Sequence, residues 1–191
     1  MNKQNPGVLY GLIGAAILII IGLVMQMYIV SVLQKAVDSG ASMSPMKFIG
    51  VSILSFILIV TIFIVCLTKA MKDFRKNNQD YTYKKLVGQG LLTTLLIAFV
   101  STGFSLLYSG VIDPDARQKT IDLTVQVYEN VNLPEEQKDK IIASIQDQDI
   151  VRQTVTSLSL TLFFGLIVSL IGASVLNKRG KEFPTNPNNL S

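Results

Sequence analysis

Residues 86–115 read LVGQGLLTTLLIAFVSTGFSLLYSGVIDPD, and this stretch decides the fold class. It contains 27 consecutive residues without a charged side chain and ends at Asp113 and Asp115, which flank Pro114. About 20 apolar residues in a helix cross the roughly 30 Å hydrocarbon core of a bilayer. The stretch is therefore long enough to span a membrane. It also raises the question of whether the acidic pair ends that helix or forms a site.

Three further segments lack charged side chains over a comparable length: 31 residues at 4–34, 21 at 48–68 and 25 at 153–177. Only 16% of all residues are charged, whereas soluble domains carry roughly 25%. The sequence therefore predicts an all-α integral membrane protein in which four transmembrane helices form a bundle. The expected spans are about 8–34, 48–68, 86–112 and 153–177.

These spans form a single expected transmembrane domain at residues 8–178. It lies between a short amino-terminal segment at 1–7 and a Pro- and Asn-rich tail at 179–191, which is predicted to be disordered. The first apolar run is longer than the roughly 7–15 residues of a signal-peptide core. We therefore expect it to be a retained span rather than a cleaved signal.

Residue types that catalysis needs are scarce. The chain has no histidine, which excludes His-based zinc sites and nucleophilic triads with a histidine base. Its single cysteine, Cys66, cannot form an intrachain disulfide. The sequence contains no P-loop or GxGxxG pattern. We expect a protein that is not an enzyme and that binds no cofactor, metal ion or nucleic acid.

Basic residues favour one orientation in the membrane, because Lys and Arg near helix ends tend to face the cytoplasm. With the amino terminus inside, the inner segments hold ten basic and three acidic residues, whereas the loop at 113–152 holds five basic and nine acidic residues. This asymmetry predicts a multi-pass membrane protein with both termini in the cytoplasm. The basic loop at 69–85 is interpreted as a topogenic signal, or as a binding site for anionic lipid.

Small and polar residues recur at helical spacing in three of the four spans. Helices in lipid associate through close backbone contact at small residues, because lipid tails are as apolar as leucine. The second span has mostly large side chains and is expected to be more peripheral. Ten residues are predicted to pack helix against helix: Gly11, Gly14, Gly22, Gly90, Ala98, Thr102, Thr161, Gly165, Ser169 and Gly172. The alternative is a water path, which usually carries an ionisable residue inside the membrane; here none is found.

The loop at 113–152 contains two patterns that start helices. Asp113 fits an N-cap with Pro114 at the first helical position, and Asn132 fits a second N-cap with Pro134 in the first turn. Residues 121–127 alternate apolar and polar side chains, which is a strand pattern, but the flanking caps favour helix. We predict a short helical hairpin on the outer face. Two carboxylates around a proline fall short of the six to eight oxygens of a calcium site. The acidic pair is therefore interpreted as marking the end of the third span and the start of the next helix.

Taken together, several of these motifs resemble a bacterial membrane family. The stretches YGLIGAA at 10–16, IDPD at 112–115, LPEEQ at 133–137 and FFGLIVSLIGA at 163–173 occur in the order found in the family of domain of unknown function 4199. The family usually has Asn where this chain has Asp113, and both residues cap helices. The resemblance covers about residues 8–178. It implies a four-span inner-membrane protein, and it supplies no activity, substrate or catalytic residue.

Three functional hypotheses follow, in order of preference. The favoured one is a non-enzymatic accessory or self-associating membrane subunit, which acts through contacts with a copy of itself or with another membrane protein. The alternative is a small transporter or channel for a neutral or apolar solute, because the absence of intramembrane charge argues only against ion or proton coupling. A membrane enzyme ranks third, since it would have to use the loop carboxylates.

Overall fold

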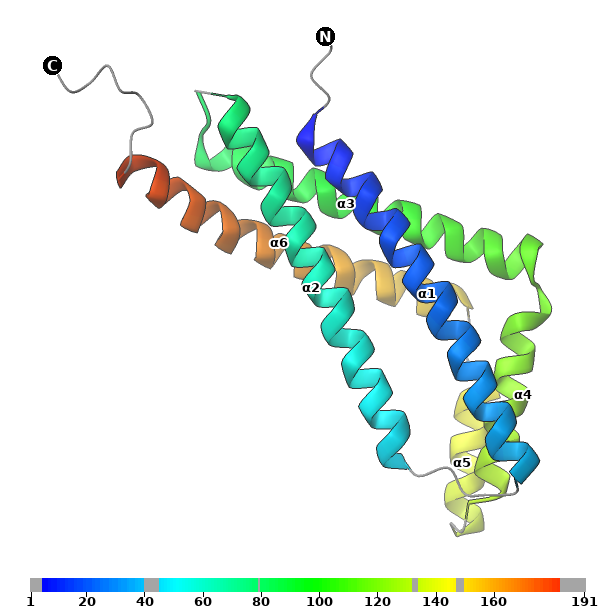
Figure 1. Cartoon of the computed structure of the whole chain (residues 1–191). Coiled ribbons are helices and arrows are strands. Elements are labelled where there is room, and N and C mark those ends of the chain that lie inside the picture. The colour runs from blue at the N-terminus through cyan, green and yellow to red at the C-terminus, as the bar shows by residue number, and fades with distance from the viewer. Residues whose placement is uncertain (1–4, 40–44, 79, 132–133, 147–149, 183–191) are drawn as a thin grey trace, which may run out of the picture. The chain divides into compact units, whose positions relative to one another are not determined.

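The computed structural model describes residues 5–39, 45–78, 80–131, 134–146 and 150–182 (Figure 1). Within these ranges the chain is helical and has no strand, which confirms the predicted all-α fold. In order, the elements are α1 (Pro6–Ser39), α2 (Pro45–Asn77), α3 (Tyr83–Leu107), the π-helical turn η1 (Tyr108–Ile112), α4 (Asp115–Glu129), α5 (Glu135–Gln146) and α6 (Ile150–Glu182).

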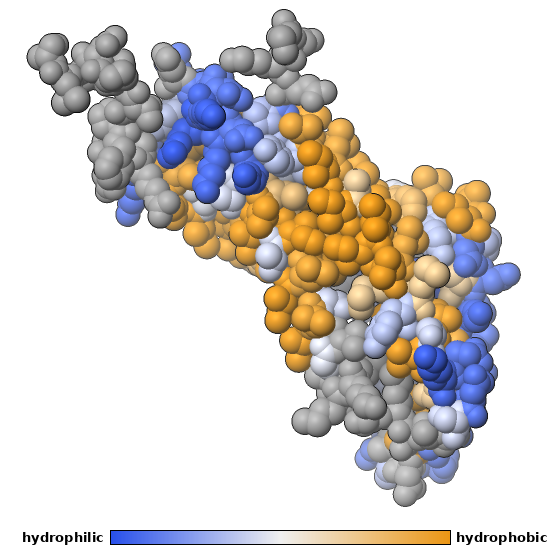
Figure 2. Space-filling view, in the orientation of Figure 1, coloured by the Kyte–Doolittle hydropathy of each residue, from blue (hydrophilic) through white to orange (hydrophobic). Residues whose placement is uncertain are grey.

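Four helical segments of the described chain are long and apolar enough to cross a membrane: Pro6–Ser39, Ile53–Asn77, Tyr83–Ile112 and Val151–Lys178. Many large apolar side chains on them are exposed, including Ile20, Phe56, Phe99 and Phe163. Figure 2 shows such hydrophobic residues over much of the visible helix surface. This surface suits contact with the lipid bilayer, and the chain is a membrane protein.

Local sequence explains where several helices begin and end. α1 starts with Pro6 behind Asn5, whose Oδ1 accepts a hydrogen bond from the Gly7 N–H at 2.9 Å, as an N-cap does. η1 closes with a hydrogen bond of 2.8 Å from the Asp113 N–H to the Tyr108 carbonyl. The helix ends there because Pro114 has no N–H and its ring would clash with the preceding turn.

The chain divides into two compact units. Unit 1 comprises Met1–Ile17, Val60–Val100 and Ser157–Ser191, and unit 2 comprises Leu18–Ile59 and Ser101–Thr156. Unit 1 contains the fully buried side chains Leu67, Met71, Leu86, Thr93, Thr94, Ile97 and Ser169.

The role of α2 differs between its two parts. In unit 1, α2 contributes Phe63, Cys66, Leu67 and Met71 to the buried core, so the prediction that the second span is peripheral is wrong there. In unit 2, residues 53–59 of the same helix are exposed except for the half-buried Ser55. The large side chains of this span were interpreted as lipid-facing, but in unit 1 Phe63 packs against Phe164 of α6, and Cys66 lies beside Gly14 of α1.

Unit 2 has a smaller apolar core between α1 and the hairpin of α4 and α5. Leu33 and Ala36 of α1 and Leu123 and Val127 of α4 are buried together. α4 and α5 contact one another and lie side by side in Figure 1. The predicted helical hairpin between the third and fourth spans is therefore present. Its strand-like alternation at 121–127 lies within α4.

Candidate functional site

The closest helix contact in unit 1 lies between α3 and α6. A Cβ atom built on Gly165 of α6 would overlap the side chain of Thr94, and one built on Gly90 of α3 would overlap the side chain of Ser169. Thr94 and Ser169 are fully buried. Both glycines are therefore required for the backbones to approach this closely, and the predicted packing residues Gly90, Gly165 and Ser169 meet here.

A second glycine contact in unit 1 joins α1 to α3. A Cβ on Gly11 would lie 2.7 Å from the Leu96 Cβ, and one on Gly14 would lie 2.9 Å from the Ile97 Cδ1. The Gly7 N–H also donates to Oε1 of Gln89 at 3.0 Å. α1 thus presents a glycine face to the larger side chains of α3.

α2 and α6 pack against each other through a different combination of residues. A Cβ on Gly172 would lie 2.6 Å from the Met71 Cε. The rings of Phe63 and Phe164 are 5.7 Å apart between centroids and tilted by 41°. This contact pairs a glycine with a flexible large side chain, which can adapt its shape to the space available.

The buried hydroxyls of this core are directed into helix contacts. Thr93 Oγ1 donates to the Gln89 carbonyl at 2.9 Å, and Thr94 Oγ1 donates to the Gly90 carbonyl at 3.0 Å. Ser169 Oγ has no hydrogen-bond partner among the described residues, although it is fully buried. These polar groups are covered by neighbouring helices, so they do not line an open water path in this unit.

The remaining predicted packing residues have weaker contacts. Ala98 is buried, whereas Thr102 and Thr161 are half-buried, and Thr161 Oγ1 donates to the Ser157 carbonyl of its own helix at 2.9 Å. Gly22 is exposed, and no described atom outside its own helical turn lies within 4 Å of a Cβ built on it. The packing role predicted for Gly22 is therefore corrected: helical spacing placed it on the face of Gly11 and Gly14, but no helix approaches it among the described residues.

Sequence reasoning missed two polar contacts at one end of unit 1. The Tyr10 hydroxyl donates to Asp73 Oδ2 at 2.6 Å, and Arg75 Nη1 donates to the Leu176 carbonyl at 2.8 Å. The first joins α1 to α2 and the second joins α2 to α6. The partners of the first bond are 63 positions apart in the chain, and those of the second are 101 positions apart. No local sequence pattern could therefore have indicated these bonds.

The predicted helix caps lie at the ends of the hairpin helices. Pro114 occupies the N-cap position of α4 with helical torsions (φ −60°, ψ −30°), whereas Asp113 is non-helical (φ −143°, ψ 77°). The predicted N-cap, Asp113, is therefore corrected: the N-cap lies one residue later, at Pro114, and no side-chain hydrogen bond caps α4 there. Pro134 directly precedes α5, and its carbonyl accepts from the Gln137 N–H at 2.9 Å. The predicted N-cap Asn132 lies outside the described residues.

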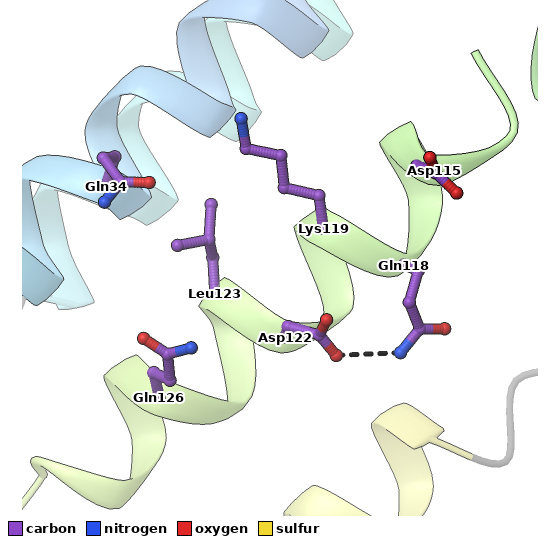
Figure 3. Close-up of a pocket in the computed structure, with 7 residues that line it drawn as sticks. All are labelled: Gln34, Asp115, Gln118, Lys119, Asp122, Leu123 and Gln126. Carbon is purple, nitrogen blue, oxygen red and sulfur yellow. Dashed lines mark hydrogen bonds between the residues drawn. The ribbon is translucent and has the colours of Figure 1, made fainter.

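The hairpin and α1 border an open depression in unit 2 (Figure 3). It is lined by Gln34, Asp115, Gln118, Lys119, Asp122, Leu123 and Gln126. Gln118 Nε2 donates to Asp122 Oδ1 at 2.8 Å along α4. Figure 3 shows Lys119 and Leu123 directed toward the α1 ribbon, while Gln118 and Asp122 are directed away from it. The described residues contain no group of acidic or cysteine side chains suited to a metal ion.

Comparison with known proteins places this arrangement in a family. A search of curated proteins and a search of solved structures both gave no match. The chain matches the family described as protein of unknown function (DUF4199) over residues 9–178, which confirms the resemblance seen in the sequence motifs. The match covers more than half of the chain, and the protein therefore belongs to the DUF4199 family.

Proposed function

We propose that the protein is a non-enzymatic accessory or self-associating subunit of a bacterial inner membrane, with both termini in the cytoplasm. The observation that carries this proposal is that the small and polar side chains of unit 1 are buried where helices pack against one another. Thr93, Thr94 and Ser169 are fully buried between helices, which supports a packing role over a solute path. Contacts with other proteins would then use the surfaces that extend beyond the membrane spans.

The hairpin supplies the surface that we assign to a partner. Its two helices carry Glu135 and Glu136 in the first turn of α5 and Asp115 in that of α4. Two lysines pair along α5, Lys138 with Glu135 at 3.1 Å and Lys140 with Glu136 at 2.7 Å. The acidic excess of the loop at 113–152 would favour a partner with a basic surface.

Crosslinking in intact cells through the hairpin lysines tests this proposal. The Lys140 side chain is 74% exposed, whereas that of Lys138 is 16% exposed, so an amine-reactive reagent should use Lys140 and the exposed Lys119. We expect one recurrent product, which mass spectrometry identifies as a second copy or as one other membrane protein. Lys119→Arg with Lys140→Arg is the matched control, because it keeps both charges but removes the reactive amines.

Two results would overturn the proposal. Crosslinks to many unrelated proteins in proportion to their abundance would show that the hairpin has no specific partner. Reproducible uptake of a neutral solute into liposomes that contain the purified protein would favour the transporter hypothesis instead. The absence of uptake together with a single recurrent crosslink is the expected combination.

A further inference from the structure

The carboxyl-terminal part of α2 separates its basic residues onto two faces. Arg75 is directed inward, where its guanidinium donates to the Leu176 carbonyl of α6 at 2.8 Å. Lys69, Lys72 and Lys76 are exposed instead. Their spacing of three and four residues places them on one side of the helix. One basic residue is therefore structural, and the other three form a ladder on the surface of unit 1, which we call the lysine ladder.

The lysine ladder is long enough to cross the headgroup layer of a bilayer. Seven residues separate Lys69 from Lys76, so the ladder extends about 10 Å along the helix axis at 1.5 Å per residue. It begins directly after the apolar segment that contains the buried Cys66 and Leu67. The polar headgroup region is roughly 5–8 Å thick on each side of the hydrocarbon core. If the hydrocarbon core ends where the apolar segment ends, the ladder begins at the level of the lipid phosphate groups.

The one carboxylate within the sequence of the lysine ladder is held by another helix. Asp73 lies between Lys72 and Lys76 in sequence, but its carboxylate accepts the Tyr10 hydroxyl at 2.6 Å. Lys85 of α3 donates to the backbone carbonyl of Asp80 at 3.0 Å rather than to a carboxylate. The ion pairs Lys138–Glu135 and Lys140–Glu136 lie in α5, away from the lysine ladder. Three lysines in this part of α2 therefore face one carboxylate, that of Asp73, and the face keeps an excess of positive charge.

Further basic residues extend this charge over the same end of unit 1. Lys84 at the start of α3 and Lys178 of α6 are exposed. Figure 2 shows hydrophilic residues gathered at the end of unit 1 where α2 leads into α3. A basic helix face beside a membrane span attracts anionic lipid, and each lysine near the surface contributes about a fivefold gain in affinity.

We propose that the lysine ladder of α2 binds the phosphate headgroup of an anionic phospholipid. The occupant is a lipid rather than a free anion because the ladder starts at the end of an apolar helix segment. Acyl chains can lie against the exposed apolar side chains Ile64 and Val65 just before the ladder. This inference requires only that the helices cross a membrane, and it is independent of the partner proposed for the hairpin.

Thermal unfolding of the purified full chain in neutral detergent tests this proposal, with circular dichroism as the readout. Phosphatidylglycerol should raise the unfolding temperature more than phosphatidylcholine does, with a half-saturating concentration that can be measured. In the variant Lys69→Gln, Lys72→Gln, Lys76→Gln this concentration should rise at least tenfold. The matched control Lys119→Gln, Lys138→Gln, Lys140→Gln removes the same charge from the hairpin and should respond as the wild type does.

Two further measurements of the unfolding temperature, in high salt and with inorganic phosphate, complete the test. About 0.5 M NaCl should weaken the wild-type response to phosphatidylglycerol, because salt at this concentration screens charges beyond a few ångströms; this arm needs no variant that might misfold. Inorganic phosphate at the same concentration should have little effect. An unchanged response in the ladder variant or in high salt would overturn the proposal. An equal response to inorganic phosphate would also overturn it, since the site would then bind free anions.

Discussion

The α3–α6 contact of unit 1 and the α1–α4 contact of unit 2 use residues of opposite size. The first depends on missing side chains, because Gly90 and Gly165 leave just enough room for Ser169 and Thr94. The second depends on side chains that are present, because Leu33 of α1 and Leu123 and Val127 of α4 are buried against one another.

The difference follows from the medium in which each contact forms. Inside a bilayer, burying a leucine gains little, since lipid tails are equally apolar, and close backbone approach supplies the attraction. α4 carries Asp115 and Asp122 and is too polar to lie in the hydrocarbon core. Its contact with α1 therefore gains from removing apolar area from water, at roughly 25 cal/mol per Å². Each contact should respond to a different kind of substitution.

The largest effect is expected for Gly165→Leu. A Cβ alone already overlaps Thr94, so a leucine must force α3 and α6 apart, with a loss of at least about 3 kcal/mol of stability. The unfolding temperature in detergent and the elution profile on size exclusion would report the loss. Gly22→Leu is the control, because space around Gly22 is open among the described residues. Equal stability of the two variants would contradict the packing role of Gly165.

A smaller effect is expected for Leu123→Ala in the hairpin. Leu123 is 6% exposed within the α1–α4 core, and truncation of a buried leucine costs about 2–3 kcal/mol at sites that partly relax. Hydrogen exchange should become faster in α4, while amides of α3 and α6 in unit 1 keep their protection. The control Leu107→Ala removes the same atoms at a position that is 59% exposed. Uniform loss of protection across both units would show that the two contacts are not separable.

The smallest effect is expected for Gly90→Ala, and it should be reversible by a second substitution. The new methyl group would overlap Ser169, and overpacking by one carbon costs about 1–2 kcal/mol. Adding Ser169→Gly removes the obstructing side chain, so the double variant should recover most of the loss in unfolding temperature. Purely additive effects of the two substitutions would contradict direct contact between these residues.

Sequence alone predicted the elements well because their signals are local. Charge-free segments of 21 to 31 residues mark the spans, and Pro114 and Pro134 mark the starts of α4 and α5. The strand-like alternation at 121–127 was correctly set aside, since a lone strand has no hydrogen-bonding partner.

Partners across the bundle were less predictable, because periodicity gives the face of a helix but not what lies opposite. Gly11, Gly14, Gly90, Gly165 and Gly172 were identified from spacing, and each lies at a close contact. Gly22 was placed on the same helix face as Gly11 and Gly14, but no atom of the described residues lies within 4 Å of a Cβ built on it. Met71 was missed because the second span was expected to end at residue 68, which placed Met71 in the basic loop, whereas α2 continues and Met71 fills the space beside Gly172.

The single thiol of the chain lies within the core of unit 1. Cys66 is 5% exposed, and its Sγ would lie 3.1 Å from a Cβ built on Gly14. A folded molecule should therefore resist maleimide, and a molecule whose core has opened should take up one label. The chain thus carries one natural reporter group where α1 meets α2, and maleimide labelling of the purified protein in detergent can count opened molecules without an engineered probe.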